Sequence, residues 1–209
     1  MKKICFIPPL QDKTVKKTKT QTRRIMTIQP ANNNMMAYIC YNGDKYVGWR
    51  FITPPTSVVN IESKLFKPRY NVGEIVAIAQ PYKDIFDTLP EPYRRKSDGW
   101  ISTDLMESIG CRNKLYVKPE LMPYRIKITD VRAERLQKIS DEDCAKEGVE
   151  YLNGGYINGF SFHKDKNGGL IVYDTPQESY AALIDKINGK GTWDSNPFVW
   201  VYDYKLIIK

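Results

Sequence analysis

A long strand near the end of the sequence constrains the fold more than any other segment. Residues Phe198–Ile207 are mostly β-branched and aromatic, which is typical of a strand in the middle of a sheet. A second segment, Ile75–Ala79, follows a turn and is almost entirely apolar. Such a run predicts a strand that is buried on both faces. We therefore expect both segments in the interior of one sheet.

Three shorter segments predict further strands. Lys3–Phe6 is an apolar run that two prolines follow, and Gln21–Met26 is expected to be extended. Arg125–Val131 alternates, with Ile126 and Ile128 expected on the buried face. A hairpin is also predicted where Ala37–Tyr41 and Tyr46–Phe51 flank Asn42-Gly43-Asp44, because Asn-Gly suits the positive backbone angles of a tight turn.

Two helices have clear start signals. The first has Ser140 as its cap and ends at Glu147, before Gly148. The second begins with the capping box Thr175–Glu178, which has proline at the first helical position. The buried stripe of this second helix is expected to consist of Tyr180, Leu183, Ile184 and Ile187.

Other segments give weaker signals. Leu10–Lys17 fits a brief helix or turn, and Ser102–Met106 fits the start of a short helix. Pro81–Leu121 has no clear period, and Tyr151–Gly169 resembles a long loop that has room for its own hairpin.

The order of these elements predicts an α+β fold. Strands and helices do not alternate regularly, which favours a mixed, barrel-like sheet. A chain of 209 residues fits a single domain, with insertions expected near 27–69, 82–121 and 150–174. No apolar run reaches the roughly 18 residues of a membrane span, and no signal peptide is evident. We expect a cytoplasmic protein, with a monomer favoured.

The cysteine and histidine content excludes several classes of site. The four cysteines are widely separated, which argues against disulfides and zinc sites. His163, the single histidine, lies in a Gly/Asn/Lys-rich stretch and is expected to be solvated. Chemistry that needs a Ser-His or Cys-His pair is therefore excluded, and no metal or cofactor is expected.

The basic charge of the chain is concentrated near its start. Residues 1–24 carry eight Lys or Arg and one acid, so they account for +7 of the total net charge of +8. Within them, Lys19-Thr20-Gln21-Thr22-Arg23-Arg24 combines an amine, two hydroxyls, an amide and two guanidinium groups. Local charge of this kind indicates a binding surface, although a solvated basic arm has the same pattern.

Four stretches, in order, resemble the ASCH family, a small β-barrel class related to the PUA fold and found in prokaryotes and phage. They are Lys19–Arg24, Gly73–Val76, Ile128–Gly148 and Gly191–Val201. The resemblance, which is to the long prophage-type members, implies a PUA-like barrel with a basic cleft for RNA or a modified nucleoside.

The same resemblance implies a set of site residues. Some small members remove the acetyl group from acetylcytidine with a Lys, a Thr and a Glu, which by motif are Lys19, Thr22 and Glu147. Many relatives carry an Arg-Glu pair where this chain has Ala79-Gln80. The residues expected to contact a nucleoside or nucleic acid are Thr20, Arg23, Arg24, Gln80, Tyr82 and Tyr124.

Hydrolysis sets two conditions. Lys19 can act as a base only if its pKa falls from about 10.4 to about 7–8, and burial and nearby arginines shift it in that direction. Residues three apart on a regular strand point to opposite faces, so Lys19 and Thr22 converge only where the backbone bends.

Three functions therefore remain open. They are binding of RNA or a nucleoside base, metal-independent deacetylation of an acetylcytidine-type nucleoside, and a phage-derived structural or assembly role. Structural explanations also fit single residues: Thr22 suits any strand, Glu147 can be an ordinary helix end, and Trp193 and Trp200 suit a core.

Overall fold

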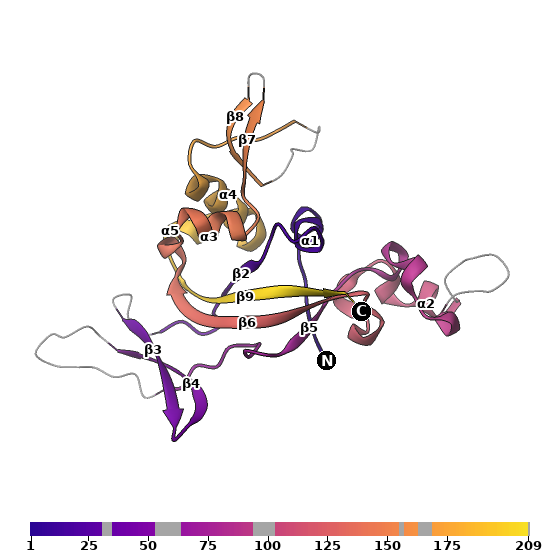
Figure 1. The fold of residues 1–209 in the computed structure, drawn as a ribbon, viewed down its shortest axis with the longest axis horizontal. Coiled ribbons are helices and arrows are strands. Elements are labelled where there is room, and N and C mark those ends of the chain that lie inside the picture. The colour runs from indigo at the N-terminus through magenta and orange to yellow at the C-terminus, as the bar shows by residue number, and fades with distance from the viewer. Residues whose placement is uncertain (31–34, 53–63, 94–102, 155–156, 163–168, 209) are drawn as a thin grey trace, which may run out of the picture. The chain divides into compact units, whose positions relative to one another are not determined.

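The computed structural model of this chain describes residues 1–30, 35–52, 64–93, 103–154, 157–162 and 169–208 (Figure 1). These residues form strands and short helices, which confirms the predicted α+β class. The chain divides into two compact units. The first unit consists of Met1–Thr20, Val72–Thr129 and Tyr204–Lys209, and the second consists of Gln21–Asn71 and Asp130–Asp203. The single domain that the length suggests stays a prediction.

The main sheet has five strands in the order β1-β5-β6-β9-β2. β1 (Lys2–Ile4) is parallel to β5 (Ile75–Ile78), which is antiparallel to β6 (Tyr124–Arg135). β2 (Gln21–Ile25) is antiparallel to β9 (Phe198–Ile208). The sheet is therefore mixed, as predicted. Its order, with β1 and β2 at the two ends, does not show a closed barrel among the described strands, so the PUA-like barrel stays a prediction.

The two strands that the sequence analysis expects inside the sheet, β5 and β9, both take interior positions in this order. In β5 the side chains from Val76 to Ile78 are fully buried, whereas Ile75 is 44% exposed. The first residue of β5 therefore departs from the predicted burial on both faces. In β6, Ile126 and Ile128 are fully buried, as the alternating pattern predicted.

In the first unit, the prolines after β1 begin a helix, α1 (Pro8–Val15). Proline suits the first helical turn because it lacks only an N–H that would have no helical partner. The described parts of Pro81–Leu121, which has no clear period in the sequence, form single turns. Such turns are too short for a periodic pattern. These turns are 3₁₀ turns, except for the helix α2, and comprise Tyr82–Asp84, Phe86–Thr88, Glu91–Tyr93, α2 (Thr103–Glu107), Ile109–Cys111, Lys114–Tyr116 and Pro119–Leu121.

The turns pack around a core of their own within the first unit. This core joins the end of β5 to buried side chains of the turns. Its members are Ala77, Ala79, Tyr82, Ile85, Leu89, Leu105, Val117, Leu121 and Met122. Burial of these apolar side chains stabilises the described turns, which have no long helix among them.

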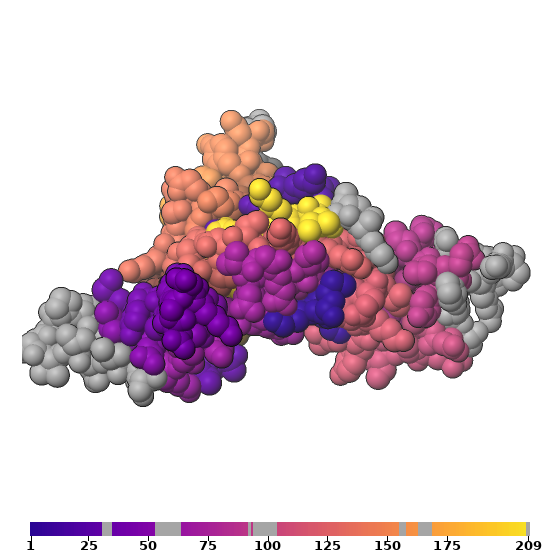
Figure 2. Space-filling view, turned by 60° about the horizontal axis from the view of Figure 1, so that its bottom comes forward, coloured from indigo at the N-terminus to yellow at the C-terminus, as the bar shows by residue number. Residues whose placement is uncertain are grey.

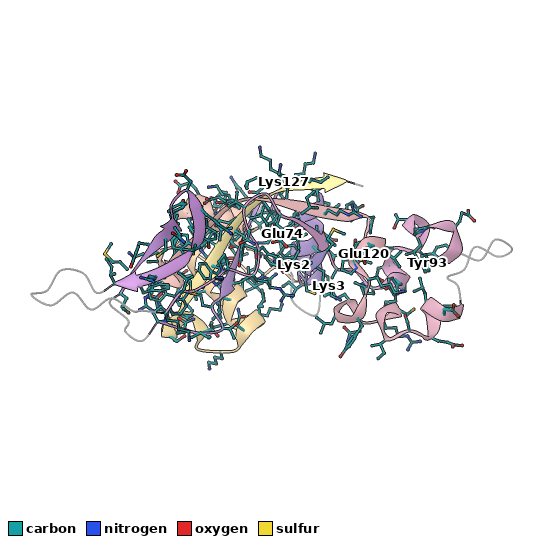
Figure 3. All side chains as sticks on the ribbon, turned by 90° about the horizontal axis from the view of Figure 1, so that it is seen from below. Lys2, Lys3, Glu74, Tyr93, Glu120 and Lys127 are labelled. Atoms are coloured by element: carbon teal, nitrogen blue, oxygen red, sulfur yellow. The ribbon has the colours of Figure 1, made fainter. Side chains whose placement is uncertain are left out.

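The N-terminal residues are fixed to the first unit by their lysines. Figure 2 shows the start of the chain, in indigo, at the surface, and Figure 3 labels Lys2 near Glu74. The Nζ of Lys2 lies 3.0 Å from a carboxylate oxygen of Glu74. The Nζ of Lys3 donates to the carbonyls of Leu115 and Val117, at 2.7 and 2.8 Å. Lys2 and Lys3 therefore have partners within the unit.

The second unit contains two hairpins. The predicted one is confirmed as β3 (Met36–Asn42) and β4 (Lys45–Ile52), joined through Gly43 with a φ of +59°. A second hairpin, β7 (Glu150–Gly154) and β8 (Ile157–Ser161), occupies part of the predicted long loop.

The second unit also contains the remaining helices, α3 (Asp141–Lys146), α4 (Pro176–Asn188) and α5 (Thr192–Ser195), and a 3₁₀ turn at Leu136–Lys138. The Ser140 cap of α3 and the capping box of α4 are both present. One expectation is wrong: Ile187, in the last turn of α4, is 38% exposed, so the buried stripe ends one turn earlier.

Within the described part of the chain, no helix combines the length and the hydropathy of a membrane-spanning segment. The four cysteines are free thiols, and Cys144 is buried. His163 lies outside the described residues.

Candidate functional site

The basic segment Lys19–Arg24 is divided between the two units. Lys19 and Thr20 end the first part of the first unit, and the next residues form β2 of the second unit. Lys19, Thr22 and Arg23 are each exposed by 5% or less. These three side chains are therefore not part of a solvated arm.

In the first unit, the Nζ of Lys19 lies 5.8 Å from the centroid of the Phe6 ring. Lys19 precedes β2, which begins at Gln21, and it follows Lys17, whose φ is +63°. The divergence expected for two residues on one regular strand therefore does not apply to Lys19 and Thr22. The carbonyl of Thr20 accepts from the backbone N–H of Tyr204 at 2.9 Å.

In the second unit, Thr22 and Arg24 lie opposite Tyr202 and Trp200 in the ladder between β2 and β9. Trp200 is buried and packs edge to face with Trp49, with ring centroids 6.0 Å apart, which confirms that Trp200 belongs to the core. The proposed set of Lys19, Thr22 and Glu147 draws members from both units. This catalytic set stays a prediction.

The side chain of Arg23 is fully buried among three carboxylates of the second unit. Its Nη2 lies 2.7 Å from Asp143 and 3.2 Å from Glu134, and its Nη1 lies 3.5 Å from Glu147. Burial lowers the pKa of Arg23, but the charge of Glu147 and the contacts with Asp143 outweigh it, so the pKa is raised. In this arrangement the guanidinium faces carboxylates of its own unit and is not exposed to a phosphate.

A second arginine, Arg132, shares two of these acids, Asp143 and Glu134. It contacts Asp143 at 2.8 Å, and it also donates to Glu134 and Asp203. Burial alone would raise the pKa of Asp143, but hydrogen bonds from Arg23 and from Lys146 lower it to about 2. Asp143 and Glu134 each contact both arginines, so they join them into one network.

Glu147 caps the C-terminus of α3 and is buried, and Gly148 follows it with a φ of +100°. Its charge also acts on Tyr180, whose pKa is raised well above the usual value, first by complete burial and then by Glu147. Nearby, burial raises the pKa of the Cys144 thiol to about 12. Cys144 is therefore protonated at neutral pH and is not a nucleophile.

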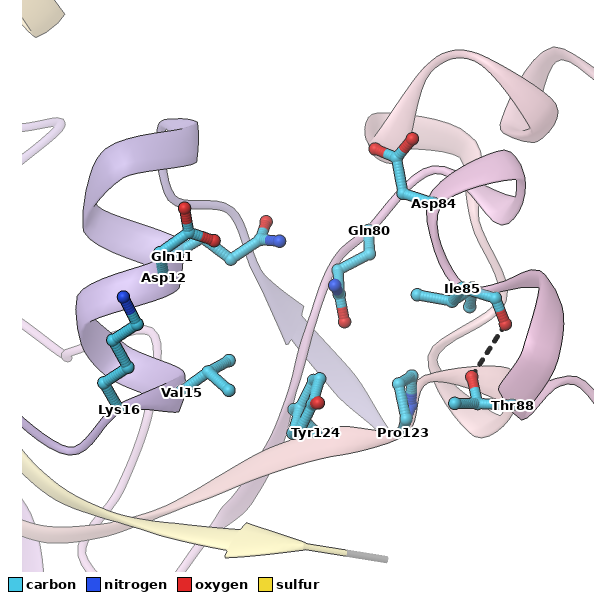
Figure 4. A pocket seen from close by; sticks show the side chains of 10 residues that line it. All are labelled: Gln11, Asp12, Val15, Lys16, Gln80, Asp84, Ile85, Thr88, Pro123 and Tyr124. Atoms are coloured by element: carbon cyan, nitrogen blue, oxygen red, sulfur yellow. Dashed lines mark hydrogen bonds between the residues drawn. The ribbon is translucent and has the colours of Figure 1, made fainter.

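A pocket of about 330 Å³ lies within the first unit (Figure 4). Its wall is formed by α1 and its C-cap, by Gln80, by the turns from Tyr82 to Thr88, and by Pro123 and the start of β6. The lining residues are Gln11, Asp12, Val15, Lys16, Gln80, Asp84, Ile85, Thr88, Pro123 and Tyr124. Two of the predicted binding residues, Gln80 and Tyr124, therefore meet at one pocket.

Gln80 is the most unusual residue of this pocket. It is 7% exposed, and its Oε1 is buried without a hydrogen-bond partner among the described residues. Figure 4 shows its amide between α1 and Ile85, with the ring of Tyr124 below it in that view. A buried amide oxygen without a partner costs about 1–3 kcal/mol. A ligand that donates a hydrogen bond here would remove that cost.

Tyr82 has a different place from Gln80 and Tyr124. Its ring belongs to the core of the turns, and its Oη accepts from the backbone N–H of Lys118 at 2.7 Å. The tyrosine is therefore fixed by its own unit, and it is not among the residues that line the pocket.

Comparison with protein-family models, with curated proteins and with solved structures gives no match. The ASCH resemblance, and the roles that it implies for Lys19, Thr22 and Glu147, stay predictions.

Sequence reasoning missed several residues of the pocket in the first unit and of the carboxylate network around Arg23 in the second unit. In the pocket these include Asp12 and Lys16, four residues apart on α1, for which a signal existed: Asp12 is the single acid among residues 1–24. In the second unit the missed residues are Arg132, Asp143 and Asp203. The alternation of Arg132 with acids along β6 places them on one face, but the partner across the sheet cannot be found without the register.

Proposed function

We propose that this chain binds a nucleoside or an RNA base, and that the base enters the pocket of the first unit. The observation that carries the proposal is the buried Oε1 of Gln80, which has no partner and lies beside an aromatic ring at a pocket. The proposal includes the ASCH resemblance, the PUA-like barrel and a cytoplasmic location, which the free thiols favour.

Gln80 has the chemistry to recognise the edge of a base. Its amide oxygen accepts from an exocyclic amino group or a ring N–H, and its amide nitrogen donates to a ring nitrogen or a carbonyl. Proteins that recognise unstacked bases combine hydrogen bonds of this kind with an aromatic side chain that stacks on the base. Gln80 and Tyr124 supply one of each.

The size of the pocket agrees with this class of ligand. Its volume of about 330 Å³ lies at the lower end of the range for small-molecule sites, which is about 300–1,000 Å³. A half-buried tyrosine such as Tyr124 contributes about 1–3 kcal/mol when a base stacks on it. The pocket therefore suits one nucleoside better than a long ligand.

Titration calorimetry of the whole chain with adenosine, cytidine, guanosine and uridine tests the proposal. We expect at least one nucleoside to bind, and Gln80→Leu and Tyr124→Ala to weaken its binding about tenfold or more, in line with the loss of one stacked base contact. Tyr116→Ala is the matched control, because Tyr116 belongs to the same unit, is 61% exposed and is not in the pocket. If no nucleoside binds the intact chain, the proposal is wrong.

Deacetylation of an acetylcytidine-type nucleoside is a second candidate. The observation that favours it is the burial of all three residues that the resemblance assigns, since Lys19, Thr22 and Glu147 are each exposed by 4% or less. Release of acetate from acetylcytidine, and its loss in Lys19→Ala and in Thr22→Ala, would support this activity. Absence of acetate release with micromolar protein would exclude it.

A further inference from the structure

We infer that the pocket of the first unit selects its ligand by charge, favouring a cationic or neutral nucleoside over a phosphorylated one. The inference rests on the proposed function, because it assigns a ligand class to the same pocket. Three features of the pocket carry it: the carboxylates in its wall, the part of α1 that lines it, and the place of the Gln80 amide.

Carboxylates outnumber cations in the wall. Asp12 and Asp84 line the pocket, and among the described lining residues only Lys16 carries a positive charge. Figure 4 shows Asp12 on α1 and Asp84 on the turn segment, on opposite sides of Gln80. Asp84 also lies 3.9 Å from Lys83, and both side chains are at least half exposed, so water and salt screen this pair and also reduce the effect of Asp84 on a ligand. The formal charge of the lining is −1, although residues 1–24 as a whole carry +7.

The helix at the pocket adds to this negative character. The residues of α1 that line the pocket run from the fourth helical residue to the C-cap, and they are Gln11, Asp12, Val15 and Lys16. The C-terminus of a helix carries a negative partial charge, whereas phosphate groups are bound at N-termini. Lys16 is the C-cap residue, where a cation balances the helix carbonyls. The N-terminal residues of α1 do not line the pocket, so α1 does not offer a phosphate the favourable end of its dipole.

Gln80 defines the orientation of the ligand between these charges. Its amide lies in the middle of the lining and contacts a hydrogen-bonding edge of the base, so that substituents of the base extend towards one of the two carboxylates. A base with a positive charge, for example one methylated at a ring nitrogen, gains an attractive interaction with the carboxylates. A phosphate on the sugar is attracted by Lys16 and repelled by two acids.

Two matched series of ligands test the inference on the intact chain. The first is 1-methyladenosine, adenosine and adenosine 5′-monophosphate, and the second is 3-methylcytidine, cytidine and cytidine 5′-monophosphate. In the series whose parent nucleoside binds, we expect the cation to bind several-fold more tightly and the monophosphate about tenfold more weakly than the parent, which is the order of magnitude for one charge in partly screened surroundings.

A double variant shows whether the carboxylates are the cause. In Asp12→Asn with Asp84→Asn, we expect the difference between cation and monophosphate to shrink to about threefold or less, since the neutral amides keep the shape of the wall but not its charge. Asp104→Asn is the control, because Asp104 is an exposed acid of the same unit that does not line the pocket. It should leave the order of affinities unchanged.

The outcomes separate this inference from the proposed function. If no nucleoside of either series binds, the proposed function fails and the inference fails with it. If the nucleosides bind but the monophosphates bind equally well or more tightly, the inference alone is overturned and nucleoside binding stands. Unchanged charge preference in the double variant also overturns it.

Discussion

Arg23 donates from Nη2 to Oδ2 of Asp143 over 2.7 Å, and the arginine side chain has no exposed surface. The same Oδ2 accepts from Arg132 at 2.8 Å, so one carboxylate oxygen is shared by two guanidinium groups. Arg23, from the basic segment of the sequence, is therefore built into the second unit through the acids of that unit. This relationship gives two predictions on stability.

Asp143→Asn should destabilise the protein by about 3 kcal/mol, because removing one partner of a buried pair leaves a charge without full compensation. Arg23 keeps its contacts with Glu134 and Glu147 in this variant, which keeps the loss at the lower end of the usual range. Urea unfolding measures the difference. Asp130→Asn is the control: its side chain is 56% exposed and lies 3.4 Å from Arg132, so its loss should cost less than about 1 kcal/mol.

Acid should remove the contribution of Asp143 to stability. Its pKa is lowered from 3.8 to about 2 in the folded protein. A group with a lowered pKa stabilises the fold fully above its unfolded value, and the stabilisation is lost as the pH falls through the folded value. We expect Asp143 to cause a loss on the order of 2 kcal/mol in the free energy of unfolding between pH 5 and pH 2. Urea midpoints at each pH measure this loss. Asp143→Asn should have a smaller loss over the same interval, and an equal loss would contradict the assignment.

Local patterns predicted most elements of the fold. The capping box of α4, the Ser140 cap of α3 and the Asn42-Gly43 hairpin each depend on neighbouring residues, and all three are present. The turns between Pro81 and Leu121 could not be predicted, because they depend on burial against β5 and not on a repeat of their own. Short segments of this kind have no periodicity for a sequence pattern to detect.

In the candidate site, too, some residues could be predicted from the sequence and others depend on contacts with distant segments. Gln80 and Tyr124 were selected from the sequence, and they meet at one pocket. The wall opposite them comes from α1, about 65 residues or more away in the chain, so Asp12 and Lys16 could not be assigned to it from spacing alone. For Arg23 the prediction from sequence differs from the structure. Its charge indicated contact with a ligand, whereas the register of β2 and the position of α3 place it among carboxylates.

Gln80→Leu should stabilise the protein while it weakens nucleoside binding. The Oε1 of Gln80 is buried without a partner, and removing such a group recovers about 1 kcal/mol or more. Gln29→Leu is the matched control, since the Gln29 amide donates to Met26 and Phe198 and accepts from the N–H of Phe198. That variant should lower stability. Thermal unfolding and calorimetry measure both effects, and a destabilised Gln80→Leu protein would show that the amide has a structural role.

Salt should have little effect on the affinity for a nucleoside. The pocket of the first unit has two carboxylates and one ammonium in its wall, and a neutral ligand brings no phosphate whose counterions are released on binding. A single-stranded RNA that binds through three phosphates would lose about a hundredfold in affinity over a tenfold rise in salt. For adenosine or cytidine we expect a change of less than about threefold over the same range, since no phosphate contact is broken. Titrations from low to high potassium chloride measure the slope directly. A steep slope for a nucleoside, or an oligoribonucleotide that binds much more tightly at low salt than any nucleoside, would place the binding surface on the basic residues instead of the pocket.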